Sequence, residues 1–157
     1  MFKPIALATI VAGTLDILFA VILTLLRGRE PANMLRGVAS GPFPAAEEWG
    51  TGGSALGLAV HFTLMAIMAT AFVVAARRFP DLLRSPLKWG LAYGLLTYVI
   101  MNLIVVPLRW PEAFPPKPLS IVTQLFAHVV LVGLPIAWIT AKTLLHPGSG
   151  AAATVHA

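Results

Sequence analysis

Four apolar stretches, each about 20 residues long, separate the charged residues of this chain. An α-helix rises about 1.5 Å per residue, so a stretch of this length crosses a bilayer hydrocarbon core about 30 Å thick. The pattern predicts an all-α integral membrane protein: one domain over residues 1–146, built as a four-helix bundle. The expected spans run about Ile5 to Leu26, Ser54 to Ala76, Trp89 to Leu108 and Ser120 to Ala141.

The composition excludes a water-soluble globule. Only 11% of the residues are charged and 58% are hydrophobic, whereas soluble chains average about a quarter charged residues. The chain has no cysteine, which excludes disulfides, iron–sulfur clusters and thiolate metal sites. The formal net charge is +5, but no Lys/Arg run is longer than a pair. Basic residues beside apolar spans usually set topology, so we expect a lipid bilayer and no nucleic acid as partner.

Charge placement indicates an orientation. The N-terminus, the second loop and the C-terminal end share one side of the membrane, and basic residues concentrate there between Arg77 and Lys88. The positive-inside rule therefore favours both termini in the cytoplasm, with the first and third loops outside. Tryptophan supports the span limits, because Trp49 and Trp110 fall at one interface and Trp89 and Trp138 at the other.

The connecting segments differ in kind. Residues 31–41 begin with proline, end with glycine and have apolar residues on one face, which predicts a short amphipathic helix along the outer interface. The stretch from Pro107 to Pro118 contains five prolines and favours extended backbone. Pro135 is expected to kink the fourth span. Residues 147–157 are rich in Gly, Ala and Ser without an apolar period, which predicts a disordered tail.

Each span carries one conspicuous polar residue: Asp16, His61, Asn102 and His128. Measured from the outer ends at about 1.5 Å per residue, these lie about 15, 10, 9 and 12 Å deep. A charge at mid-helix costs about 2.5–3.5 kcal/mol on insertion scales unless it is paired, protonated or hydrated. Side chains at matched depth can meet inside the bundle, so the four residues form a candidate ion- or ligand-binding cluster.

Neighbouring residues indicate which faces turn inward. Asp16 shares its face with Gly13, and His61 shares its face with Gly57 and Met65. Small residues at such spacing let helices approach closely in lipid. Tyr98 lies on the face of Asn102, and Gln124 lies one turn before His128, so Tyr98, Gln124 and Met65 are candidate supporting residues. The alternative interpretation is that these polar groups only hydrogen-bond across helices and hold the bundle together.

The middle of the chain shows a pattern of short motifs: His61, Phe79-Pro80, Gly90 and Gly94, Asn102, Pro107-Leu108, Pro115-Pro116 and His128. Over residues about 50 to 135 this pattern resembles the uncharacterised bacterial inner-membrane proteins of the YagU-like type. The resemblance implies a multi-pass protein of the bacterial inner membrane, a homo-oligomer or part of a larger membrane complex. It draws attention to His61 and His128 and supplies no catalytic residue.

Three functions remain open on the sequence. The first is transport or permeation of a proton, cation or small solute through a site of Asp16, His61 and His128. A divalent metal held by these three side chains is a variant of it. The second is a redox subunit in which His61 and His128 bind a b-type haem or a quinone. The third is a non-catalytic accessory or scaffold subunit. No catalytic motif or cofactor signature occurs, which argues against an enzyme.

Overall fold

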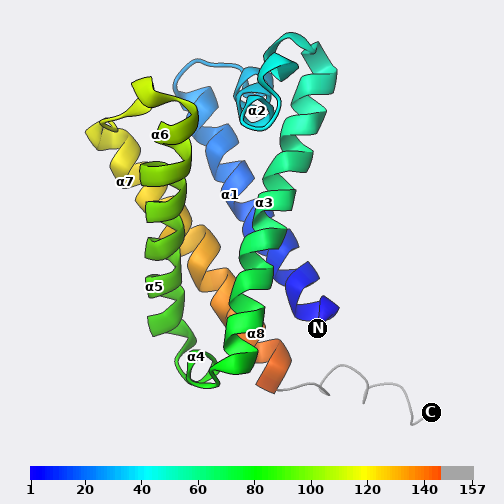
Figure 1. Ribbon diagram of the computed structural model, residues 1–157, viewed down its shortest axis with the longest axis vertical. Coiled ribbons are helices and arrows are strands. Elements are labelled where there is room, and N and C mark those ends of the chain that lie inside the picture. The colour runs from blue at the N-terminus through cyan, green and yellow to red at the C-terminus, as the bar shows by residue number, and fades with distance from the viewer. Residues whose placement is uncertain (146–157) are drawn as a thin grey trace, which may run out of the picture.

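The computed structural model describes residues 1–145, and in that part of the chain its regular structure is all helical, without a strand (Figure 1). Four helical stretches are long and apolar enough to cross a membrane: Phe2–Leu26, Gly50–Arg78, Pro86–Arg109 and Pro118–Leu145. They confirm the four predicted spans and extend them by a few residues at most ends. The predicted tail, residues 147–157, lies outside the described residues.

The first two spans are single helices, α1 (Phe2–Leu26) and α3 (Gly50–Arg78). The third consists of α5 (Pro86–Tyr98), the π-helical segment η2 (Val99–Val105) and α6 (Val106–Arg109). The fourth consists of α7 (Pro118–Phe126), the π-helical segment η4 (Ala127–Gly133) and α8 (Leu134–Leu145). The connections contain α2 (Pro31–Ser40), η1 (Pro44–Glu48), α4 (Asp81–Arg84) and η3 (Pro111–Ala113).

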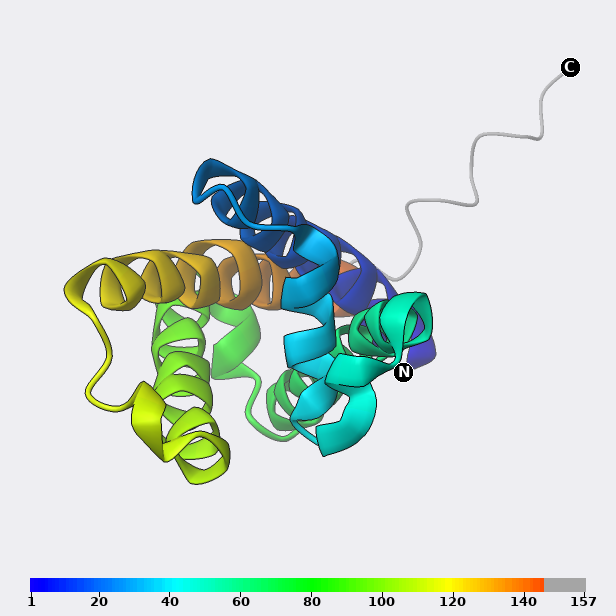
Figure 2. The same ribbon diagram turned by 90° about the horizontal axis from the view of Figure 1, so that it is seen from above.

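The two ends of the bundle carry different connections. The N-terminus, α4 and the end of α8 lie at one end, here called the α4 end (Figure 1). Helix α2 and the third loop lie at the other, the α2 end. Helix α1 ends there at Leu26, and two residues later Gly28 has a φ of 66°, in the left-handed region that glycine adopts readily. Seen from above, α2 crosses between α1 and α3 (Figure 2), so it covers part of the α2 end.

The apolar core fills the half of the bundle nearer the α4 end. Its buried members come from three spans: Ala8 and Ala12 of α1, Met65, Ala69, Phe72 and Ala76 of α3, and Val132, Ile136 and Ala137 of the fourth span. The third span joins this half through Tyr93, which donates a hydrogen bond of 2.7 Å to the Met68 carbonyl and packs against Phe72. Most other large apolar side chains point outward, as expected of helices surrounded by lipid.

Glycines bring the third and fourth spans into backbone contact. A Cβ placed on Gly133 would lie 2.3 Å from the Gly90 oxygen and 2.6 Å from the Gly94 Cα. A Cβ on Gly94 would lie 2.5 Å from the His128 carbonyl oxygen. No side chain fits at these positions, so the row Gly90, Gly94 and Tyr98, buried throughout, is the packing face of α5.

Each π-helical segment ends two residues before a proline. The segment η2 precedes Pro107, and η4 precedes Pro135. A proline ring clashes with the carbonyl four residues earlier in an α-helix, and local widening to a π-helix relieves that contact in membrane helices. The sequence predicts a kink at Pro135, and the structure has the π-helical segment η4 shortly before this proline. Asn102 and His128 lie within the two segments.

The proline-rich third loop is more helical than its sequence predicts. Pro107 lies in α6, and Pro111 begins the short 3₁₀ turn η3. A proline at the first position of a helical turn costs no hydrogen bond, because that N–H has no partner within the turn. Extended backbone dihedrals occur at Phe114 and Lys117, with a bend at Pro115 between them. The expectation of extended backbone across the whole loop is therefore wrong.

Candidate functional site

Asp16 of α1 and His61 of α3 face each other inside the bundle. The His61 Nδ1 lies 3.9 Å from the Asp16 Oδ2, and 9% and 18% of the two side chains are exposed. The α2 end of the core lies next to them, since Met65 packs one turn along α3 from His61. His128 lies on η4, which packs against α1, the helix that carries Asp16. Three of the four polar residues singled out in the sequence therefore lie near one another.

The imidazole of His61 is fixed by the backbone of α1. Its Nε2 lies 2.9 Å from the Gly13 carbonyl oxygen. A carbonyl only accepts hydrogen bonds, so Nε2 carries the proton and donates it. The remaining nitrogen, Nδ1, is then the one that takes up or releases a proton, and it faces Asp16. Gly13 allows this approach, because a Cβ there would lie 2.7 Å from the Phe62 ring.

His128 is held in the same manner by its own helix. Its Nδ1 lies 3.0 Å from the Gln124 carbonyl oxygen and donates to it. The Nε2 of the neutral ring is therefore an acceptor. The Tyr98 ring packs edge-on against the imidazole, with 6.1 Å between ring centroids. Each histidine thus has one nitrogen committed to a backbone carbonyl and one that can bind a proton.

The other predicted residues have different places. Gln124 contributes its main-chain carbonyl to His128. Met65 is buried in the apolar core, so it packs beneath the polar groups. Asn102 is half-buried in η2, and its side chain makes no hydrogen bond within residues 1–145. The site that the geometry supports is thus Asp16, His61 and His128, which we call the polar triad.

The polar triad is less suited to binding a divalent metal or a b-type haem than to binding a proton. Among residues 1–145, no group of three His, Asp or Glu side chains is close enough to hold a metal ion. Axial ligation of a haem by His61 through Nε2 would require breaking its hydrogen bond to Gly13. The free positions, His61 Nδ1, His128 Nε2 and the Asp16 carboxylate, are proton acceptors that need no rearrangement.

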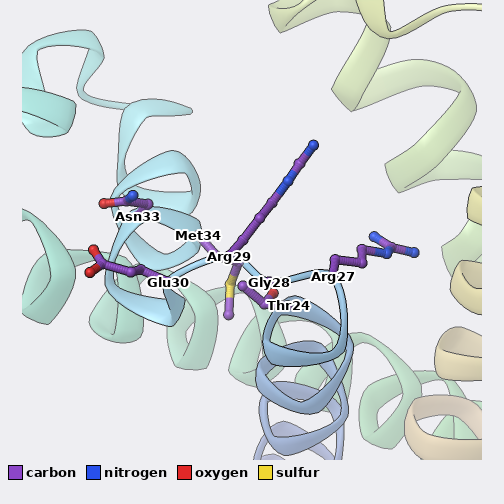
Figure 3. Close-up of a pocket in the computed structure, with 7 residues that line it drawn as sticks. All are labelled: Thr24, Arg27, Gly28, Arg29, Glu30, Asn33 and Met34. Carbon is purple, nitrogen blue, oxygen red and sulfur yellow. The ribbon is translucent and has the colours of Figure 1, made fainter.

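Apart from the polar triad, a hollow of about 570 Å³ lies at the turn between α1 and α2. Figure 3 shows the Arg27 and Arg29 side chains extending away from Glu30 and Asn33, so their polar ends do not converge on a common point. The hydroxyl of Thr24, which also lines the hollow, donates to the Ala20 carbonyl of its own helix. This hollow therefore lacks a defined set of ligand groups.

Arg109 has a role that the sequence did not indicate. Its Nε and Nη2 donate hydrogen bonds of 3.0–3.2 Å to the Ser40 and Gly41 carbonyls. These carbonyls belong to the C-terminal end of α2, where a positive charge is favourable. Arg109 thereby attaches α2 to the third span above the polar triad.

No protein-family profile, curated protein or solved structure matches this chain.

Proposed function

We propose that this chain is a multi-pass membrane protein that binds and passes a proton through the polar triad, as part of a transport or permeation activity. The observation that carries the proposal is the pairing of Asp16 with the free nitrogen of His61, 3.9 Å apart, in the interior of helices that can span a membrane. Intramembrane ionisable residues are costly, and apolar side chains would pack there at lower cost.

The chemistry of the pair supports proton binding. With one proton between them, Asp16 and His61 form either an imidazolium and a carboxylate or a neutral imidazole and a carboxylic acid, and both forms have zero net charge. Loss of the proton leaves one negative charge inside the membrane. The Nε2 of His128, on the segment η4 that packs against α1, provides a second acceptor. Three groups that can bind a proton therefore lie on α1, α3 and η4 with limited exposure to water.

The setting that we propose is a bacterial inner membrane, with the α4 end and both termini in the cytoplasm. Basic residues between Arg77 and Lys88 support this orientation. The similarity of residues about 50 to 135 to the YagU-like proteins stays a prediction that agrees with this setting. In this orientation the polar triad lies in the outer half of the membrane and α2 covers its outer side.

Proteoliposomes test the proposal. Purified protein is reconstituted in vesicles containing a pH-sensitive dye, and internal pH is followed after a pH jump across the membrane. We expect wild-type vesicles to equilibrate faster than empty vesicles, and Asp16→Asn, His61→Gln and His128→Gln to abolish most of the difference. Thr63→Ala is the matched control, because Thr63 is exposed on α3 and its hydroxyl bonds only to its own helix.

Three results would count against the proposal. One is a wild-type proton flux equal to that of empty vesicles. Another is a wild-type flux that all three substitutions leave unchanged, since the triad would then be packing only. A flux lost equally in Thr63→Ala would indicate general damage to the helix and would also remove the support for the triad.

A further inference from the structure

A groove of about 580 Å³ opens between the second and third spans at the α2 end. Val60 and Leu64 of α3 form one wall, and Met101 and Val105 of the third span form the other. Helix α2 covers its top, where Gly37 is part of the lining. These walls are apolar, so the groove is suited to a hydrocarbon ligand.

The groove is open at its side because α3 and the third span meet only near the α4 end. There the Tyr93 hydroxyl bonds to the Met68 carbonyl, and the Tyr93 and Phe72 rings pack with 5.0 Å between centroids. At the same level the glycines of the third span, Gly90 and Gly94, face the fourth span, and the groove lining from Met101 to Trp110 lies beyond both contacts, toward the α2 end. The bundle therefore has an open side in the α2 half, which faces the surrounding lipid if the helices span a membrane.

One end of the groove carries an unbalanced positive charge. Arg109 is the only charged residue of the lining. Within residues 1–145 it forms no ion pair with an acidic side chain, and its Nη1 makes no hydrogen bond. The guanidinium lies 5.1 Å from the centroid of the Trp110 ring, which also lines the groove. Tryptophan and arginine together are typical of the level of lipid headgroups.

The charge of the groove distinguishes between two kinds of occupant, an acyl lipid and a helix from a second copy of the chain. Its wall on the third span extends from Met101 to Arg109, about 12 Å at 1.5 Å per residue, and Arg109 stands at the end of that wall. A headgroup phosphate would pair with the guanidinium, whereas an apolar helix face would leave its charge without a counter-ion. The groove therefore favours a lipid.

We propose that this groove is a binding site for an anionic phospholipid of the surrounding bilayer. One acyl chain lies between α3 and the third span beneath α2, and the headgroup phosphate accepts hydrogen bonds from Nη1 of Arg109. The apolar walls bind the chain, and the charge of Arg109 selects the headgroup. A phosphate also pairs well with the planar fork of a guanidinium.

Native mass spectrometry tests the site. Delipidated protein in mild detergent is incubated with equal amounts of dioleoyl phosphatidylglycerol and dioleoyl phosphatidylcholine. We expect one lipid bound to a protein monomer, with phosphatidylglycerol preferred about tenfold, because both lipids offer a phosphate but the choline ammonium of phosphatidylcholine cancels the negative charge that Arg109 attracts.

Three variants test the location of the site and its selectivity. Gly37→Phe places a ring in the groove, because no atom lies within 4 Å of a Cβ at this position, and should abolish the bound lipid. Gly52→Phe is the matched control, since Gly52 is equally open but lies outside the groove, and it should bind as the wild type does. Arg109→Gln should bind both lipids without preference.

Several outcomes would overturn the proposal. Equal binding of the two lipids by the wild type would remove the role of Arg109. Lipid retained by Gly37→Phe as well as by Gly52→Phe would place the lipid elsewhere. A dimer that binds no lipid and dissociates in Gly37→Phe would show that a second copy fills the groove. None of these measurements depends on proton flux, so failure here and failure of the polar triad are separate results.

Discussion

The contact between the third and fourth spans predicts that the smallest possible substitution, Gly133→Ala, destabilises the protein. The added methyl would lie 2.3 Å from the Gly90 oxygen and 2.6 Å from the Gly94 N and Cα. Non-bonded carbon atoms prefer separations of about 3.5–4.0 Å, so the two backbones must move apart by about 1 Å. All three neighbours are main-chain atoms, and no side-chain rotation can relieve the contact.

The change in the free energy of unfolding caused by Gly133→Ala is the difference between two opposing effects. Inserting a methyl into a well-packed interior costs about 1–3 kcal/mol, and a gap of about 1 Å removes up to about half of the dispersion attraction across the interface. Replacing glycine by alanine inside a helix returns about 0.5–1 kcal/mol. We therefore expect the free energy of unfolding to fall by about 1–2 kcal/mol.

Gly37→Ala makes the same chemical change where no atom lies within 4 Å of the new Cβ. Only the helix propensity acts there, so this control should be stabilised by about 0.5–1 kcal/mol. Unfolding by SDS in mild detergent, followed by circular dichroism, measures both. The reasoning is refuted if Gly133→Ala is as stable as Gly37→Ala, because the backbone contact between the spans would then carry no energy.

Two further predictions concern Asp16 and Arg109. A double-mutant cycle of Asp16→Asn and His61→Gln should show a coupling free energy of about 1–4 kcal/mol in unfolding. This is the attraction of two unit charges about 4 Å apart at effective dielectric constants of 80 to 20. If the two substitutions add within about 0.5 kcal/mol, Asp16 and His61 do not form an ion pair. Arg109→Gln should lower the free energy of unfolding by about 1.5–3 kcal/mol and increase amide hydrogen exchange in α2. Lys117→Gln, in the same loop, should change neither quantity. If hydrogen exchange in α2 is unchanged in Arg109→Gln, Arg109 does not attach α2 to the third span.

The bilayer explains why the spans could be predicted from the sequence. Its thickness fixes the length of an apolar helix, so the four stretches were identified with boundaries a few residues short. The similar depths of Asp16 and His61 in the membrane likewise predicted that these two side chains approach each other. The position of a residue along its span limits which residues of an antiparallel neighbour it can reach.

Other features depend on packing that no local pattern specifies. His61 bonds to the Gly13 carbonyl, and every helical residue offers such a carbonyl, so the partner is known only once α1 and α3 are placed. The open side of the bundle arises because the glycine row of α5 faces the fourth span rather than α3. The π-helical segments had a signal, the prolines at 107 and 135, but the change in winding that these prolines cause was not anticipated.

The prolines also have a consequence for the angular position of His128. A π-helical turn contains more residues than an α-helical turn, so the seven residues of η4 rotate the chain by a smaller angle than the same residues would in an α-helix. If Pro135 were replaced and the segment rewound, α7 and His128 would rotate about the helix axis relative to α8. The direction in which the imidazole points is thus set by a residue seven positions away.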